Sequence, residues 1–399
     1  MSNRPCVLFI SPQPFYEDRG TPIAVYQELK AYRELNFNIH LLTYPIGREV
    51  TLPGIRIIRV INPYRCRSVP IGLSRHKLLF DFLILLKALE LIRQFRYDFI
   101  HCVEESVYMG LLCKWMFGVP VIYDMHSSLT EQLRESKIFN HGFVIRLATL
   151  MENVGIRHAD CLIGSHGLAS HINSIAPGKI FHECRFEADS LPPKNLSLAR
   201  RLGIEDQSLL VYAGNFSSYQ GIDLLIEATV LVRQAIPHFK LLLVGGTKDE
   251  ILSIERKLQR HRLSNTVILL QRRPQQEILG YLALGDALVM PRPRGLNAPM
   301  KIYTYILANK PIVATNIPAH TSILDEETAI LVNPDPQSLS EGIVCALTNK
   351  KRIKQITDTS RSVFRNNLKS PLKKTLLNAS SWVLKKTPDN LIALKESRT

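Results

Sequence analysis

The feature that most constrains the fold is an alternation of short apolar runs with longer amphipathic segments. The short runs are rich in β-branched residues, as in Val7–Ile10 and Phe99–Val103. Segments with the spacing of an amphipathic helix lie between them, such as Ile23–Leu35 and Val107–Phe117. Strands that alternate with helices in this way form a parallel sheet with helices on both faces. The sequence therefore predicts an α/β fold.

The alternation occurs twice, which predicts two domains. It stops within Phe186–Ser197, where paired prolines with aspartate and serine indicate a linker, and it starts again at Leu209–Ala213. We therefore expect one parallel-sheet domain over residues 1–190 and another over residues 191–375. Residues 376–399 are expected to form a helical segment that crosses back to the first domain.

The charge balance narrows the class of partner. The chain carries 50 Lys and Arg against 35 Asp and Glu, a formal net charge of +15. Such an excess favours phosphorylated ligands and anionic membrane surfaces. We do not expect a nucleic-acid partner, because the basic residues are spread along the chain and are not interleaved with aromatic residues on one face.

The chain shows no signature of secretion or of a membrane span. Its apolar N-terminal run is too short for a signal peptide, and charged residues interrupt the longest apolar run, Leu78–Ile92. The cysteines show no CxxC motif and no paired metal-ligand spacing, so we expect reduced thiols, no metal site and a cytoplasmic location. The segment Arg75–Arg96 is apolar nearly all round with cations at both ends. It either packs on the sheet or lies on an anionic membrane, such as the inner face of the plasma membrane.

One stretch, Asp286–Thr315, combines a strand, a polar loop and the start of a helix. Ala287–Met290 reads as a buried strand, and after a loop of Pro, Arg, Gly and Asn a helix is expected to open at Pro299. Free backbone N–H groups and the helix dipole make such a loop an anion site. Three cations add positive charge around it: Arg292, Arg294 and Lys301. This stretch therefore predicts a site for the phosphates of a nucleotide-linked substrate.

Four stretches of the chain, in this order, resemble family 4 glycosyltransferases. Tyr212–Ala228 (YAGNFSSYQGIDLLIEA) resembles the first strand, loop and helix of the family's C-terminal domain. Lys301–Thr315 is similar to its donor-binding helix and the strand that follows. Phe15–Leu29 resembles its N-terminal phosphate loop, and Pro120–Ser127 the strand that ends in an acceptor-side histidine. The resemblance implies the GT-B fold, in which two Rossmann-like domains with parallel sheets face each other across a cleft.

The resemblance also implies an activity. The family moves a sugar from a nucleotide-sugar donor with retention of configuration, without a metal or a further cofactor. We therefore expect transfer of a hexose-type sugar to a glycan or lipid-linked acceptor, in the synthesis of cell-surface polysaccharide or glycolipid. Two other functions stay open: a nucleotide-sugar epimerase of the same fold, and a non-catalytic protein that binds nucleotide sugars.

Four positions depart from the family pattern. Where the family has a basic residue and a lysine in the first C-terminal loop, this chain has Asn215 and Gln220. The family's paired glutamates fall on Leu296 and Thr304. Thr304 cannot accept two ribose hydroxyls as a carboxylate does. The usual donor contacts are therefore altered.

The predicted catalytic residues are one histidine and two cations. A charge-assisted contact is worth about 1.5–3 kcal/mol, so we expect Lys301 and Arg294 to hold the leaving diphosphate in place of the lost basic pair. His126, at the end of the strand VIYDMH, is expected to act on the acceptor, with Asp124 orienting it. His101 reads as a structural residue. Each predicted site residue also has a structural interpretation, as an ordinary turn, a helix cap or a solvated basic loop.

The other predicted contacts bind substrate. Gly20 lets backbone approach a diphosphate, and Arg272 borders the nucleobase together with Arg273. The predicted binding residues are Gly20, Thr21, Asp124, Asn215, Gln220, Gly221, Arg272, Arg292, Asn297, Ala298 and Thr304.

Overall fold

The chain divides into two units. The structure is a computed structural model that describes residues 4–17, 20–66, 69, 74–135, 142–184, 191–296, 298–367 and 371–385. Unit 1 comprises Met1–Phe186 with Ser370–Thr399, and unit 2 comprises Glu187–Lys369. The sequence-based division set the end of the second domain at residue 375, whereas the structural division falls at Lys369 because the last described helix packs on unit 1.

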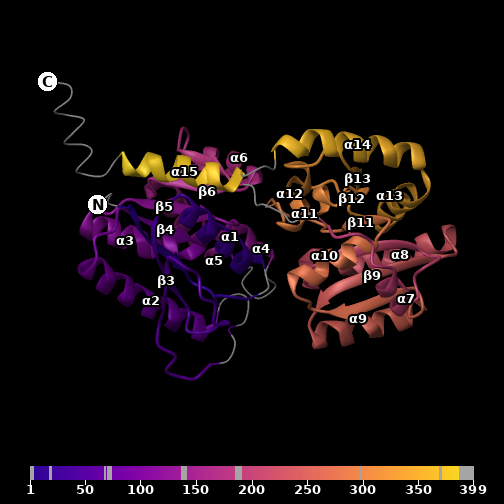
Figure 1. Cartoon of the computed structure of the whole chain (residues 1–399), viewed down its shortest axis with the longest axis horizontal. Helices are drawn as coiled ribbons and strands as arrows, with labels where there is room; N and C mark the ends of the chain where they lie inside the picture. Colours follow the sequence, from indigo (N-terminus) through magenta and orange to yellow (C-terminus); the bar gives the residue numbers. More distant parts are fainter. Residues whose placement is uncertain are drawn as a thin grey trace. The chain divides into compact units, whose positions relative to one another are not determined.

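Unit 1 is built on a parallel sheet, of which β3, β4, β5 and β6 are labelled in Figure 1. The strand order is β3-β2-β1-β4-β5-β6-β7. Its strands are β1 (Cys6–Ser11), β2 (Asn38–Thr43), β3 (Ile55–Arg59), β4 (Phe99–Val103), β5 (Val121–Met125), β6 (Cys161–Gly164) and β7 (Phe181–Glu183). The order reverses between β1 and β4, and such a switch point is where open α/β sheets bind ligands, beyond the carboxyl ends of the strands.

Helices cover both faces of this sheet. They are α1 (Gly20–Glu34), α2 (Arg75–Gln94), η1 (Glu104–Ser106), α3 (Val107–Phe117), α4 (Leu129–Glu135), α5 (Gly142–His158), α6 (His166–Ile175) and α15 (Pro371–Leu384). Alternate residues of β1 point to opposite faces, so Leu8 and Ile10 join the core under α2 and α3, and Val7 and Phe9 join the core under α1 and α15. The chain's last described helix therefore completes the fold of unit 1.

Unit 2 repeats the plan with the strand order β10-β9-β8-β11-β12-β13. Its strands are β8 (Ser208–Ala213), β9 (Phe239–Gly246), β10 (Val267–Gln271), β11 (Ala287–Met290), β12 (Ile312–Thr315) and β13 (Ile330–Val332). Its helices are α7 (Leu196–Leu202), η2 (Ser218–Gln220), α8 (Ile222–Ala235), α9 (Lys248–Arg260), α10 (Gln275–Leu284), α11 (Lys301–Leu307), α12 (Pro318–Thr321), α13 (Pro336–Thr348) and α14 (Lys350–Asn367). The switch point lies between β8 and β11.

Both units are α/β domains with all-parallel sheets, so the predicted fold class is confirmed for each of them. The helix expected to open at Pro299 begins two residues later, at Lys301. None of the described helices is both long enough and apolar enough to cross a bilayer.

Candidate functional site

The first candidate site lies in unit 2, where the loops after β8 and β11 meet at the switch point. Gly221, just before α8, has φ of 78°, and a Cβ added there would lie 1.9 Å from the carbonyl oxygen of Pro291. Gly214, just after β8, would place a Cβ 3.0 Å from the Nζ atom of Lys301. A Cβ at Gly221 would collide with the backbone of the loop after β11, and one at Gly214 would crowd the ammonium of Lys301, so these glycines allow the two loops to approach closely.

Lys301 is the centre of this site. It is the first residue of α11, and its Nζ donates a hydrogen bond to Oε1 of Gln220 at 3.2 Å. The same ammonium lies 3.9 Å from the centre of the Tyr212 ring, a cation–π contact. The hydroxyl of Tyr212 in turn donates to the carbonyl oxygen of Asn215 at 2.8 Å. Asn215 and Gln220, which replace the family's basic residues, therefore help to build the surroundings of Lys301.

The electrostatics of this site favour an anion. Burial, and then the positive charge of Arg292, lower the pKa of Lys301 well below the ordinary value. Within the described part of the chain, no carboxylate pairs with this ammonium. Two neighbouring cations repel each other, and a bound phosphate would neutralise both.

Sequence reasoning missed one residue of this site, His320 on α12. Its Nδ1 lies 2.9 Å from the carbonyl oxygen of Thr315. Burial, together with Arg292 and Lys301, lowers the pKa of His320 to about 4, so the ring is neutral at pH 7. Its buried Nε2 has no hydrogen-bond partner among the described residues. The sequence signal for His320 was its position shortly after β12, a strand of the same sheet as β11 and the loop that follows it.

The other predicted residues of unit 2 differ in how far their side chains are exposed. Arg292 is half-buried beside Lys301, whereas Arg294 is exposed. Ala298 is buried, and Thr304 is half-buried one turn after Lys301 on α11. Asn297 lies outside the described residues. Their roles stay predictions.

Arg272 follows β10 at the same end of the sheet. Its backbone N–H donates to the carbonyl oxygen of Gly246 at 3.1 Å, and its side chain is exposed. An exposed guanidinium at the carboxyl end of the strands can contact a ligand. Its role at the nucleobase stays a prediction.

The predicted phosphate loop of unit 1 leads directly into α1. That helix begins at Gly20, with the half-buried Thr21 next, three residues before the amphipathic segment Ile23–Leu35 that the sequence predicts. A Cβ added to Gly20 would meet nothing within 4 Å. The contacts of the described residues therefore do not require a glycine here, and the predicted role of Gly20 at a diphosphate stays a prediction.

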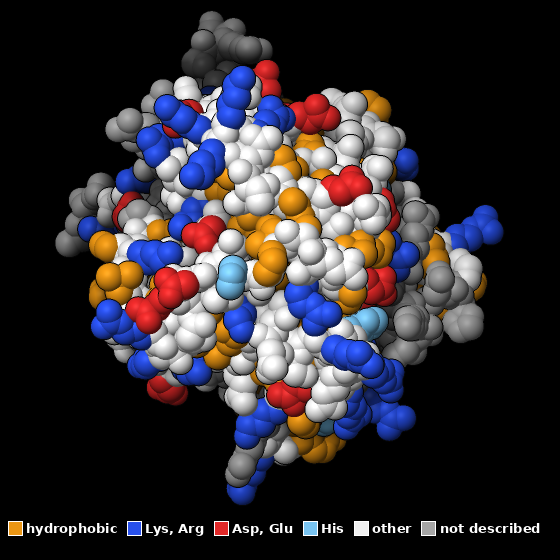
Figure 2. Space-filling model, turned by 90° about the vertical axis from the view of Figure 1, so that its right-hand side faces the viewer, with side chains coloured by type: hydrophobic (Ala, Val, Ile, Leu, Met, Phe, Trp, Pro, Cys, Tyr) orange, Lys and Arg blue, Asp and Glu red, His pale blue; other side chains and the backbone are white. Residues whose placement is uncertain are grey.

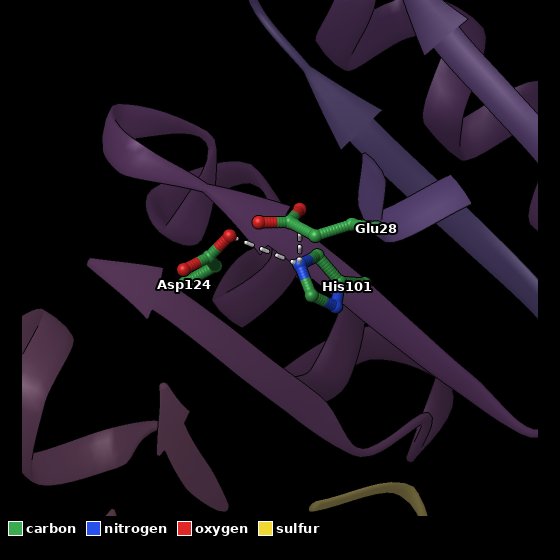
Figure 3. Close-up of side chains that lie close together, drawn as sticks. All are labelled: Glu28, His101 and Asp124. Carbon is green, nitrogen blue, oxygen red and sulfur yellow. Dashed lines mark hydrogen bonds and ion pairs between the residues drawn. The ribbon is translucent and has the colours of Figure 1, made fainter. Parts of the chain in front are cut away.

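A cluster of acids and histidines forms the second candidate site, at the carboxyl ends of β4 and β5 in unit 1 (Figure 3). Nε2 of His126 lies 2.9 Å from Oδ2 of Asp124, so the expected contact between these two residues is present. His101 Nε2 lies 3.4 Å from the same oxygen and 3.7 Å from Oε2 of Glu28. His101, interpreted from the sequence as structural, therefore joins a buried charge network together with Glu28, which no sequence pattern singles out.

The charges of this network are coupled. Burial raises the pKa of Glu28 to about 7, and Asp124 adds to the effect. Burial alone would raise the pKa of Asp124 as well, but His126 and His101 together lower it below its usual range. Burial also opposes the charge on His126, but Asp124 and then Glu28 raise the pKa of this imidazole well above its ordinary value. This raised pKa favours the charged form of His126, whose side chain is 11% exposed at the edge of the cluster.

Two family models match the chain, one in each unit. The family described as glycosyl transferase 4-like domain matches residues 19–169, and the family described as glycosyl transferases group 1 matches residues 207–349. The chain therefore matches a glycosyltransferase domain model in each of its two units, and its fold is that of GT-B glycosyltransferase structures. Each match contains one of the two candidate sites: His126 and its partners fall in the first, Lys301 and its partners in the second.

Solved glycosyltransferases share this fold. Sucrose-phosphate synthase from Thermosynechococcus elongatus is 20% identical with a TM-score of 0.73, over 99% of this chain and 100% of that one. Anabaena HepE in complex with UDP and glucose is 17% identical with a TM-score of 0.73, over 95% and 100% of the two chains. WaaG, a glycosyltransferase involved in lipopolysaccharide biosynthesis, is 14% identical with a TM-score of 0.67, over 92% and 98%. A comparison with curated proteins found no match in sequence.

Proposed function

We propose that this GT-B glycosyltransferase is a retaining hexosyltransferase that takes its sugar from a nucleoside-diphosphate donor bound in unit 2. The observation that carries the proposal is the enclosed ammonium of Lys301, which lies beside Arg292 without a carboxylate partner among the described residues. A diphosphate is the ligand that such a pair stabilises best. HepE was solved with UDP-glucose, and its shared fold supports a uridine donor with a hexose.

The proposed mechanism stabilises the departing diphosphate. As the bond between the anomeric carbon and the diphosphate oxygen breaks, Lys301 and Arg292 would neutralise the negative charge that develops on that oxygen, and Arg294 would add to it from the exposed loop. The acceptor oxygen bonds to the anomeric carbon on the same face, and its proton passes to the leaving phosphate. No metal is needed at the diphosphate in this scheme.

The proposed acceptor side lies in unit 1. The partly exposed imidazolium of His126 would donate a hydrogen bond to the acceptor, and Asp124 behind it fixes the ring's orientation. Thr21 and Gly20, at the first turn of α1, would contact the same substrate. The acceptor is proposed to be a glycan or a lipid-linked glycan, as in the synthesis of cell-surface polysaccharide or glycolipid.

A membrane-bound acceptor agrees with two surfaces of the molecule. Leu78, Phe82 and Leu86 on α2 are 55%, 56% and 48% exposed although they are large and apolar, and they follow one another at helical spacing. Basic side chains gather near the top of the face shown in Figure 2. The first turns of α14 carry four cations: Lys350, Lys351, Arg352 and Lys354. We propose that the enzyme works in the cytoplasm, on the inner face of the plasma membrane.

Flotation with vesicles tests the membrane proposal. The chain should float with vesicles that contain anionic lipid, and Phe82→Ser should weaken this binding severalfold. Leu252→Ser is the matched control, because Leu252 is 52% exposed on α9 of unit 2. Equal binding of all three proteins would exclude a role for the exposed face of α2.

Incubation with nucleotide sugars tests the activity. A panel of nucleotide sugars should contain one that raises the melting temperature and, with a glycan or lipid-linked acceptor, yields a glycosylated product of retained configuration. An epimer formed from the donor alone would identify an epimerase instead. Binding of a nucleoside diphosphate without transfer to any acceptor would identify a non-catalytic binder, which the uncharged Asn215 and Gln220 would then explain.

A further inference from the structure

The cluster at the carboxyl ends of β4 and β5 has the composition of a metal site. We propose that Glu28, His101 and Asp124 bind a divalent transition metal, such as Zn²⁺ or Mn²⁺, inside unit 1. The three residues come from α1, β4 and β5, and their side chains converge on one point in Figure 3. Carboxylate and imidazole donors suit both metals. The site is separate from the diphosphate site proposed in unit 2.

The spacing of the donor atoms fits a first coordination shell. Ligands held about 2.0–2.2 Å from a tetrahedral metal lie about 3.3–3.6 Å from one another. Nε2 of His101 lies 3.4 Å from Oδ2 of Asp124 and 3.7 Å from Oε2 of Glu28, and the donor atoms of all three residues lie within 4.8 Å of one another. These distances are longer than most N–H···O hydrogen bonds and leave room for an ion.

Glu28 is the observation that points to a ligand. It is only 1% exposed, and neither of its carboxylate oxygens has a hydrogen-bond partner among the described residues. Glu152, another buried acid of the same unit, does have hydrogen-bond donors: its carboxylate accepts from Ser128, from the backbone of Thr130 and from His171. A buried carboxylate without such donors needs positive charge beside it. Oε2 of Glu28 faces Nε2 of His101, and Oε1 faces Nε2 of His126.

The surroundings of His101 resemble those of a metal-binding histidine. Its far nitrogen, Nδ1, shares a hydrogen bond of 3.0 Å with the hydroxyl of Tyr32, and its ring stacks on Phe9 with centroids 4.2 Å apart. Histidine ligands are usually oriented in this way, by a hydrogen bond at the nitrogen that does not bind the metal. The Tyr32 contact leaves Nε2 directed at the two carboxylates.

His126 marks the solvent side of the site. Its Nε2 lies 2.9 Å from Oδ2 of Asp124 and 3.6 Å from Oε1 of Glu28. Its side chain is 11% exposed, whereas those of His101 and Glu28 are 0% and 1% exposed. A metal would therefore enter past His126. The competing occupant is a proton shared between the imidazoles and the carboxylates, and it needs no metal.

Metal content decides between the two occupants, and the measurement does not depend on transferase activity. The full chain is treated with a chelator, dialysed against Zn²⁺ or Mn²⁺, and analysed by mass spectrometry, with the electron paramagnetic resonance signal of Mn²⁺ as a second readout. We expect about one ion per chain and release of protons on binding. Glu28→Gln, which keeps the shape and removes the charge, should weaken binding at least tenfold.

A matched control is available on β2. His40 is also buried, and its Nδ1 also shares a hydrogen bond with a tyrosine hydroxyl, that of Tyr97 at 2.6 Å. His40→Gln should therefore leave metal binding unchanged. Circular dichroism establishes that each variant folds, and Asp124→Asn takes the place of Glu28→Gln if the latter does not.

Three results would overturn the proposal. The first is a wild-type chain that retains no metal after dialysis against either ion. The second is equal binding by wild type and by the variants at Glu28 and Asp124, which would place the ion elsewhere. The third is an equal loss of binding in His40→Gln, which would mean that any disturbance of a buried histidine has this effect.

Discussion

Replacing Lys301 with methionine separates a binding role from a structural one. Methionine keeps most of the length and the apolar stem but removes the charge. The ammonium is enclosed beside Arg292, and this environment lowers its pKa well below the ordinary value, so the folded protein holds the charge at a cost. The variant should therefore unfold at the same temperature as the wild type or at a higher one, which is unusual for a change at an enclosed residue.

The same variant should bind a nucleoside diphosphate poorly. A charge-assisted contact contributes about 1.5–3 kcal/mol, and each 1.4 kcal/mol changes a dissociation constant tenfold. Loss of one such contact to the diphosphate predicts a dissociation constant for UDP that rises about 10- to 150-fold. Turnover should fall further, by about 10²–10³, because the contact is strongest when charge develops on the leaving oxygen.

Isothermal titration with UDP measures this loss, and Lys310→Met is its matched control. Lys310 belongs to the same unit, and burial also lowers its pKa. Its ammonium donates to the carbonyl oxygen of Gly285 and is favoured by the negative charge of Asp286, whereas that of Lys301 is opposed by the positive charge of Arg292. Lys310→Met should lower stability and leave UDP affinity unchanged. UDP affinity within a factor of about two of wild type in Lys301→Met, well short of the tenfold loss expected per charge-assisted contact, or a clear drop in its melting temperature, would refute the reasoning.

Three further results are expected. The pKa of Lys301 is lower in the folded protein than the ordinary lysine value of about 10.4. At pH values between the two, the unfolded chain binds more protons, so the free energy of unfolding should rise with pH. Chemical denaturation at several pH values should find a smaller rise in Lys301→Met. Gly221→Ala should cost several times the roughly 1 kcal/mol expected for Gly118→Ala, because both glycines have positive φ but only Gly221 would place its Cβ 1.9 Å from a carbonyl oxygen; equal melting temperatures would contradict this. Glu152→Gln should destabilise unit 1 by about 1–3 kcal/mol, since it disturbs bonds from Ser128, Thr130 and His171; an unchanged denaturation midpoint would count against that network.

Most strands of the fold could be predicted because short apolar runs of this kind are typical of strands buried in a parallel sheet. Phe99–Val103 and Ala287–Met290 coincide with β4 and β11. β7 was missed because Phe181–Glu183 is short and carries a histidine and a glutamate, so it lacks an apolar run. The start of α11 was expected at Pro299, but the first turn there is tighter, with the N–H of Ile302 bonded to the oxygen of Pro299.

The candidate sites could be predicted only where the residues are neighbours in sequence. Asp124 and His126 are two positions apart at the end of one strand, so their contact could be expected. Glu28 and His101 come from separate elements, and only the pairing of β1 with β4 and the packing of α1 bring them together. In the loop after β11, the sequence offered two arginines, and the backbone places Arg292 rather than Arg294 beside Lys301.

The central claim is that the loops after β8 and β11 of unit 2 bind the diphosphate of a nucleotide sugar. A crystal structure of the full chain with UDP tests it most directly. The proposal predicts diphosphate oxygens within hydrogen-bonding distance of Nζ of Lys301 and of the guanidinium of Arg292. A diphosphate bound elsewhere, with Lys301 still bonded to Gln220 as in the absence of ligand, would contradict it.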